Sequence, residues 1–263
     1  QAALDSYGGH LLFGSGDMVF SSLDLLRQEI HAAGTSQLLT PTDFLERHAI
    51  DPKELMALMK KFNGLNVTVL GDLIVDEYIT CEALGMSQED PTLVVGPIYS
   101  EKFLGGSAIV AAHASGLGAS VRYFSVACDD EMRTFAVDKS KEFGIDAQIF
   151  VDESRPTTLK QRFRANGKTL LRVSRLKQHE IGRELIDAMW PKIKNSLSTS
   201  HLVFFSDFNY GCLPNKLVEK VEAYCTERGI LMVADSQSSS QVGDVSRFKN
   251  MLLLTPTERE ARL

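Results

Sequence analysis

Several aspartates of this chain stand where parallel strands would end, which is where open α/β sheets bind ligands. They follow short apolar runs at 67–70, 202–205 and 230–234, and they are Asp72, Asp76, Asp207 and Asp235. Asp72 and Asp76 can hydrogen-bond the hydroxyl groups of a sugar from this position. A plain turn aspartate is the alternative at each place.

A pair of glycines, Gly105 and Gly106, precedes small and apolar residues at helical spacing: Ala108, Ala111, Ala112 and Ser115. The pattern predicts a strand or loop that turns tightly into a closely packed helix. The first N–H groups of a helix lack partners and carry the positive end of its dipole, and glycine lets a ligand approach the backbone. The junction therefore suits a phosphate or a polyhydroxylated substrate, with tight packing alone as the competing explanation.

A basic hairpin is predicted from two runs, 157–163 and 168–173, joined by Ala165-Asn166-Gly167. Asn-Gly between alternating runs is a strong hairpin signal, because both turn positions favour positive φ. Its basic residues are Lys160, Arg162, Arg164, Lys168, Arg172 and Arg175. On a chain of formal net charge −6, they are either a clamp for phosphate or solvated strand faces.

From Asn66 onward, short apolar runs alternate with helical segments, which predicts an α/β fold with a parallel sheet and right-handed crossovers. The runs 93–95 and 98–103 fit a small additional sheet. Before this region, residues 51–62 form a predicted amphipathic helix with Asp51 as N-cap and Pro52 in its first turn. We expect its apolar stripe to pack on a domain or on a second copy of the chain.

The composition excludes some classes of partner. With 263 residues, 44% of them hydrophobic, the chain can bury a substantial core, and its negative charge argues against general affinity for nucleic acid or anionic membranes. No apolar run reaches about 18 residues, the length that signals a membrane span. Four separated cysteines without a C-x-x-C pair predict reduced thiols in a cytoplasm. We expect small-molecule partners.

Ordered blocks of the sequence resemble the ribokinase-like (PfkB) carbohydrate kinases, especially the heptose-phosphate kinase branch of bifunctional nucleotidyltransferase–kinases (ADP-heptose synthase-like). The glycine pair is similar to that family's Gly-Gly-Ala-x-Asn-Val-Ala signature. The other similar blocks are 67–78, 86–95, 157–162, 205–211, 234–236 and 254–261. The resemblance implies a three-layer sandwich with a mostly parallel sheet and a small β lid, incomplete at its C-terminus.

The resemblance also implies an activity, which is transfer of a phosphoryl group from ATP with Mg²⁺ to a sugar or sugar phosphate by a homodimer. Residues expected to bind the substrate are Asp72, Asp76, Gly105, Gly106, Lys160, Arg162 and Asp207. Residues expected to bind the nucleotide are Asp235, Thr257 and Glu260, with Glu260 also at the metal. The family's catalytic base is the Asp of a later Gly-Ala-Gly-Asp motif, which this sequence does not contain.

The domain organisation follows from the same resemblance. Residues 1–33, with Gly8-Gly9 and Ser21-Ser22, resemble the tail of a cytidylyltransferase-like nucleotidyltransferase, although serines that merely cap a helix explain the pattern equally well. Residues 34–65 form a linker with the amphipathic helix, and residues 66–263 form the kinase domain without its ATP-binding end. The chain opens on Gln1 and closes where a helix begins, so we expect both ends to be truncated.

Two positions depart from the family pattern. Ile109 stands where the glycine signature has asparagine, and Thr257 stands for the asparagine of an Asn-x-x-Glu motif that keeps Glu260. These departures leave a second interpretation open, a module that binds or scaffolds a sugar phosphate without catalysis. A nucleotide-binding dehydrogenase domain is a third, and it lacks a G-x-G-x-x-G after the first strand.

Overall fold

The computed structural model describes residues 41–237 and 243–262, and the chain divides into two compact units, 1–52 and 53–263. In the first unit the described part contains α3 (Thr42–Arg47), where the Phe44 and His48 rings lie 4.4 Å apart. The expected nucleotidyltransferase tail at 1–33 lies outside the described residues and stays a prediction. Helix α4 (Pro52–Lys60) confirms the expected amphipathic helix, with its apolar residues Leu55, Met56, Leu58 and Met59 exposed.

Six parallel strands form the main sheet of the second unit, in the order β10-β9-β8-β1-β4-β5. Their bounds are β1 Asn66–Gly71, β4 Ser120–Ala127, β5 Asp146–Val151, β8 Leu202–Asp207, β9 Leu231–Ser236 and β10 Leu253–Leu254. The short apolar runs predicted these strands because a parallel sheet is buried on both faces. The expected parallel sheet is confirmed.

Helices cover both faces of the sheet, which makes three layers. On one face, Val67 and Val69 of β1 pack with α5 (Ser107–Gly116) and α6 (Glu131–Glu142). On the other, Leu70 packs with α7 (Arg183–Leu197) and α8 (Asn215–Arg228). Alternate residues of β1 face opposite sides of the sheet, so this one strand packs against both helical layers. Full burial of each such aliphatic side chain contributes about 1.5–3 kcal/mol to stability. In the described part of the chain no helix is long and apolar enough to cross a membrane.

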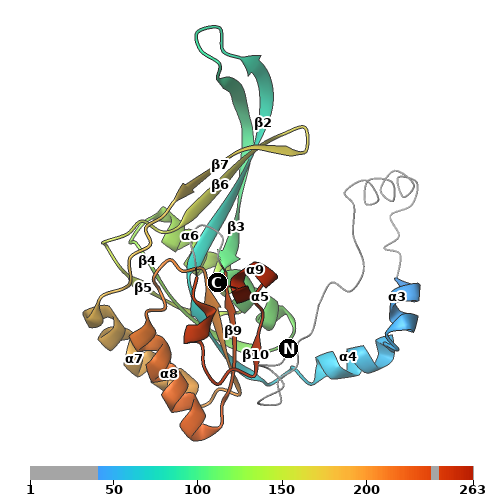
Figure 1. The fold of residues 1–263 in the computed structure, drawn as a ribbon, viewed down its shortest axis with the longest axis vertical. Helices are drawn as coiled ribbons and strands as arrows, with labels where there is room; N and C mark the ends of the chain where they lie inside the picture. Colours follow the sequence, from blue (N-terminus) through green and yellow to red (C-terminus); the bar gives the residue numbers. More distant parts are fainter. Residues whose placement is uncertain (1–40, 238–242, 263) are drawn as a thin grey trace. The chain divides into compact units, whose positions relative to one another are not determined.

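A second, four-stranded sheet has the order β3-β2-β6-β7 and is called the lid below. Its strands are β2 Leu73–Met86, β3 Leu93–Gly106, β6 Leu159–Ala165 and β7 Lys168–Arg175. Figure 1 shows β2 and β3 running from the main sheet into a long hairpin, with β6 and β7 beside them. The predicted hairpin is confirmed, with Asn166 and Gly167 at φ of 50° and 74°.

The lid is larger than the sequence predicted. We expected two short runs, 93–95 and 98–103, whereas β3 continues through Gly96 and Pro97. Proline is tolerated there because β3 is an edge strand and the pairing register shifts near Cys81, opposite Pro97. We also predicted no strand directly after the Gly71-Asp72 turn, where the structure has β2.

The chain ends its described part with two short helical turns. They are the 3₁₀ helix η1 (Val245–Arg247) and the helix α9 (Glu258–Arg262), which follows β10.

Candidate functional site

A cavity of about 1150 Å³ lies between the inner face of the lid and the start of α5. All four lid strands contribute to its wall, together with Phe208 after β8 and Gln237 after β9. Five residues that the sequence predicted for substrate binding line it: Asp76, Gly105, Gly106, Lys160 and Arg162. The structure therefore brings together residues that lie up to 86 positions apart, such as Asp76 and Arg162.

The basic residues of the β6–β7 hairpin gather on the cavity side because alternate residues of a strand share one face. Lys160, Arg162 and Arg164 of β6 line the cavity together with Arg172 of β7. The acidic residues of the lining are Asp76 and Glu101. Four cationic side chains against two anionic ones favour an anionic ligand.

Asp76 lies at the centre of this wall. Its Oδ1 forms an ion pair with Arg162 Nη1, and the two side chains are 20% and 24% exposed. Its other oxygen lies directly over Gly105, where a Cβ atom would come 2.1 Å from Oδ2. Glycine at position 105 is therefore required for the Asp76 carboxylate to reach the start of α5.

Gly106 makes the turn from β3 into α5. Its φ is 57°, which disfavours other residues, and a Cβ would lie 2.4 Å from the Asp72 carbonyl oxygen. The same carbonyl accepts the Ser107 N–H at 3.0 Å, and the Ser107 and Tyr123 hydroxyls are 2.7 Å apart. The glycine pair thus serves tight packing and also lines the cavity, and its part in binding a substrate stays a prediction.

Lys160 projects toward two aromatic rings. Its Nζ lies 5.4 Å from the centroid of Phe208 and 5.1 Å from that of Tyr210, within the range of cation–π attraction. Across residues 41–237 and 243–262, no ion pair involves Lys160. Its ammonium is oriented without being neutralised by a carboxylate.

Asp72 does not line the cavity. It is 3% exposed, and its carboxylate accepts the N–H groups of Phe208 at 2.8 Å, Tyr210 at 3.3 Å and Cys212 at 3.0 Å. Burial, followed by the negative charge of Asp207, raises the pKa of Asp72 to about 6, although these three N–H groups oppose the shift. Asp72 therefore holds the loop beyond β8 in place.

Asp207 and Asp235 also face other parts of the protein. Strands β1, β8 and β9 are neighbours, so Asp72, Asp207 and Asp235 do lie at adjacent strand ends, as the sequence indicated. Asp207 Oδ2 pairs with Arg247 Nη2 at 2.6 Å, and Asp235 Oδ1 accepts the Thr255 hydroxyl at 2.8 Å. Neither side chain lines the cavity.

Thr257 and Glu260 form a reciprocal cap on α9. Glu260 Oε2 accepts the Thr257 N–H at 2.8 Å, and Thr257 Oγ1 accepts the Glu260 N–H at 3.3 Å. In the described residues, no group of three or more His, Cys, Asp or Glu side chains could hold a metal ion. The residues present do not by themselves fit a magnesium site.

Arg155 connects three segments of this region and was not predicted from the sequence. Its side chain is 6% exposed and binds Asp152, the His179 carbonyl and the Tyr210 carbonyl. No periodicity marked it, because it lies in the loop between β5 and β6. The aromatic pair Phe208 and Tyr210 carried a signal, since two rings at a spacing of two follow a strand end directly.

Ile109 lines the cavity at the first turn of α5, at the position where the resemblance leads one to expect an asparagine. It contributes an apolar surface there.

The pfkB family carbohydrate kinase model matches residues 65–263 of this chain. The bifunctional protein HldE of Desulfatibacillum aliphaticivorans is 29% identical over 201 residues, which are 76% of this chain and 40% of HldE. The chain thus spans about two fifths of the length of the curated relatives it matches.

Two solved structures share the fold. A carbohydrate kinase from Agrobacterium tumefaciens superposes with a TM-score of 0.56 at 16% identity, covering 75% of this chain and 62% of that one. Ribokinase from Arabidopsis thaliana, solved in complex with ribose and ATP, gives 0.53 at 12% identity, covering 75% and 61%. The fold is ribokinase-like, as the sequence predicted.

Proposed function

The chain belongs to the pfkB family of carbohydrate kinases, and on this premise we propose that its protein transfers the γ-phosphate of ATP to a hydroxyl group of a sugar phosphate. The observation that carries the proposal is the cavity under the lid, where Asp76, Gly105 and Lys160 line one wall together with Phe208 and Gln237, which follow the carboxyl ends of the parallel strands β8 and β9. Such a position suits a small polar ligand. Similarity to the bifunctional protein HldE favours a heptose-type sugar and a role in nucleotide-sugar synthesis.

Different cavity residues bind different groups of the substrate. Asp76 and the backbone at Gly105-Gly106 bind hydroxyl groups, since a carboxylate accepts hydrogen bonds and the start of α5 presents the positive end of a helix dipole. Lys160 and Arg162 attract the phosphate that the sugar already carries. Together they hold the acceptor hydroxyl in one orientation, and orientation lowers the barrier of phosphoryl transfer.

We propose that the nucleotide binds at the strand ends outside the cavity that holds the sugar. We propose that Asp235, Thr257 and Glu260 lie near bound ATP, and that Glu260 exchanges its capping bond for a contact at the metal end. These residues do not form a magnesium site by themselves, and Mg²⁺ is usually held by one or two carboxylates together with waters and the phosphates of the nucleotide. We assign the role of general base to none of the described residues.

The proposal includes the setting of the enzyme. We propose a cytoplasmic homodimer that binds neither nucleic acid nor membranes, supported by the net charge of −6. The outer half of the lid supports the dimer, since it exposes large apolar side chains: Leu84, Met86, Leu93, Ile98 and Tyr99.

A second candidate function is sugar-phosphate binding without phosphoryl transfer. Ile109 favours it, because an apolar side chain lines the cavity where the family pattern has an amide.

The first test is a thermal-shift titration of the chain with sedoheptulose 7-phosphate, free sedoheptulose and ATP–Mg²⁺. A ligand that binds only the folded state raises Tm by mass action, and we expect the sugar phosphate to do so. Asp76→Ala and Lys160→Ala should abolish the shift, whereas Lys168→Ala, on the same hairpin but outside the cavity lining, should retain it. Sugar-phosphate shifts that survive both cavity variants would place binding elsewhere and sink the proposal.

A phosphorylation assay on the intact protein then separates the two candidates. Formation of ADP that depends on the sugar phosphate supports the kinase. Binding without any ADP formation supports the second candidate.

A further inference from the structure

The loop at residues 208–212 joins β8 to α8 and is called the anchored loop below. It carries both rings that flank Lys160, and Phe208 also lines the cavity. Whatever fixes this loop therefore fixes the direction in which the Lys160 ammonium points.

Two buried side chains of opposite charge hold the anchored loop through its backbone. Asp72, at the end of β1, accepts its N–H groups at positions 208, 210 and 212. Arg155 donates from Nη1 to the carbonyl oxygen of Tyr210 at 2.7 Å. Charge-assisted hydrogen bonds are about twice as strong as neutral ones, so the pair restrains the loop more firmly than backbone contacts alone would.

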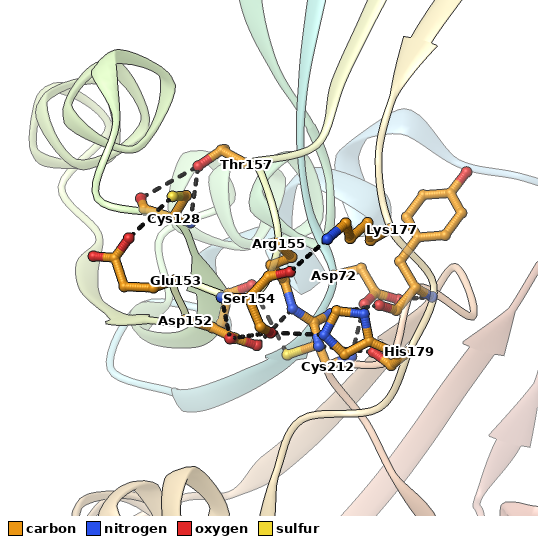
Figure 2. A network of polar contacts seen from close by, with 12 residues as sticks. Asp72, Cys128, Asp152, Glu153, Ser154, Arg155, Thr157, Lys177, His179 and Cys212 are labelled. Carbon is orange, nitrogen blue, oxygen red and sulfur yellow. Dashed lines mark hydrogen bonds and ion pairs between the residues drawn. The ribbon is translucent and has the colours of Figure 1, made fainter.

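Arg155 connects the anchored loop to two further segments (Figure 2). Its Nε donates to Asp152 Oδ2 at 2.6 Å, and its Nη2 donates to the His179 carbonyl oxygen at 2.7 Å. Asp152 follows β5, and His179 lies between β7 and α7. Figure 2 shows Arg155 between Asp152 and His179 and also draws Cys212 and Asp72. The planar guanidinium uses all its nitrogens, so lysine cannot replace it.

We propose that Asp72 and Arg155 are positioning residues that hold the anchored loop so that Lys160 points at the anionic group of the substrate. This inference rests on the proposed function for the identity of the ligand, but the restraint of the loop is independent of it. Neither residue touches the cavity, so each acts through Phe208 and Tyr210.

The restraint of the anchored loop depends on pH, because an ionised Asp72 accepts hydrogen bonds at both carboxylate oxygens. When Asp72 is protonated, one of these oxygens becomes a hydrogen-bond donor. The ionisable groups that interact with Asp72 are Asp207, with its partner Arg247, and also Cys212 and Tyr123. Arg247 partly neutralises Asp207, while the thiol of Cys212 and the phenol of Tyr123 stay protonated, since burial raises the pKa of both. With a pKa raised to about 6, Asp72 changes charge between about pH 5 and pH 7.

The experiment compares wild type with Asp72→Asn, Arg155→Lys and the control Arg133→Lys. Arg133 also donates to a backbone carbonyl, that of Ile149, and to an aspartate, Asp129, but it lies on α6 away from the anchored loop. Affinity for sedoheptulose 7-phosphate and for free sedoheptulose is measured by calorimetry at pH 7.5. Amide hydrogen exchange of residues 208–212 is measured on the same proteins without ligand.

We expect Asp72→Asn and Arg155→Lys to weaken the sugar phosphate about tenfold, roughly the loss of one charge-assisted hydrogen bond, and to leave free sedoheptulose unchanged. Exchange at residues 208–212 should accelerate in both variants and stay unchanged in Arg133→Lys. Equal losses for both sugars would mean general destabilisation and overturn the proposal. Unchanged exchange would overturn it too.

The pH profile uses sulfate as the probe, because its charge is constant between pH 5 and pH 8 whereas that of a phosphate ester is not. Wild type should bind sulfate more weakly at pH 5 than at pH 7.5, and Asp72→Asn should lose most of this difference. If the sulfate affinities of wild type and Asp72→Asn changed equally with pH, that result would contradict the role of Asp72. If no sugar binds to wild type, the proposed function fails for that sugar, and hydrogen exchange still decides whether Asp72 and Arg155 restrain the loop.

Discussion

Asp72 and Asp76 are the same residue type four positions apart, yet their environments differ. Asp76 faces the cavity from β2, paired with Arg162, whereas Asp72 is enclosed by the backbone of the anchored loop. The turn after β1 makes the difference, because Asp72 comes before β2 begins and Asp76 belongs to its cavity-facing side. The type of side chain predicts the kind of contact, and the backbone decides with which partner it is made.

The pKa of Asp72 leads to a prediction for stability. Because the folded state raises this pKa from 3.8 to about 6, it binds the proton more tightly than the unfolded chain does. The resulting stabilisation is present below about pH 4 and is lost as pH rises to about 6, a change of about 3 kcal/mol. Asp72→Asn cannot titrate, so urea unfolding at pH 4.5 to 7 should show a weaker decline for the variant. Equal slopes in the two proteins would contradict the raised pKa.

At the level of elements, the junction between β3 and α5 shapes the floor of the cavity. Gly105 leaves room for the Asp76 carboxylate, and Gly106 turns the chain into the helix. The junction therefore couples two sheets, since β3 belongs to the lid and α5 packs on the main sheet.

Gly116, the last residue of α5, provides a comparison for Gly105 of β3. In Gly105→Ala the new Cβ would lie 2.1 Å from Asp76 Oδ2 and displace that carboxylate, so affinity for sedoheptulose 7-phosphate should fall at least about tenfold. In Gly116→Ala no atom lies within 4 Å of the new Cβ, and the unfolding free energy should rise by up to about 1 kcal/mol with affinity unchanged. Calorimetry and urea unfolding measure both, and similar affinities in the two variants would refute the role of Gly105.

The sequence indicated most of the elements but only part of the site. The parallel strands were predictable because each is a short apolar run between turn residues. Strand β2 was missed because its first half is buried and its second half exposed, which hides the alternation. The pairing of β2 with β6 was not predictable, since parallel pairing joins distant segments without a local turn signal.

The same difference between local signals and long-range contacts explains how much of the site could be predicted. Asp76, Gly105, Gly106, Lys160 and Arg162 gather at one cavity, as the resemblance implied for substrate binding, although their roles stay predictions. Arg155 could not be found from the sequence, because two of its three partners are backbone carbonyls that any residue would offer.

At the scale of the whole molecule, the second unit combines a buried sheet with a lid that exposes apolar side chains. Ile98 is 65% exposed and Leu84 is 60% exposed, and both lie in the outer half of the β2–β3 hairpin. Apolar surface gathered in one place is typical of protein–protein contacts. This supports the proposed homodimer.

Ile98→Lys tests the homodimer directly. A charge in the interface should raise the dimer dissociation constant at least about tenfold, because the ammonium would lose water without gaining a partner. Leu252→Lys is the control, since Leu252 is 66% exposed but lies beside β10 and outside the lid. Sedimentation equilibrium measures the association. A wild-type monomer, or a dimer that Ile98→Lys leaves intact, would exclude the lid as the interface.

The pairing of β2 with β6 has a consequence for how the chain is made. Gln161 of β6 donates a hydrogen bond to Glu77 of β2, which lies 84 positions earlier in the sequence, so the ribosome completes β2 long before its parallel partner exists. During that interval one edge of β2 presents unpaired N–H and C=O groups, and such an edge can pair with another nascent chain. The cavity therefore acquires its cationic wall late in synthesis, and a chaperone that covers β2 in the meantime should raise the yield of folded protein.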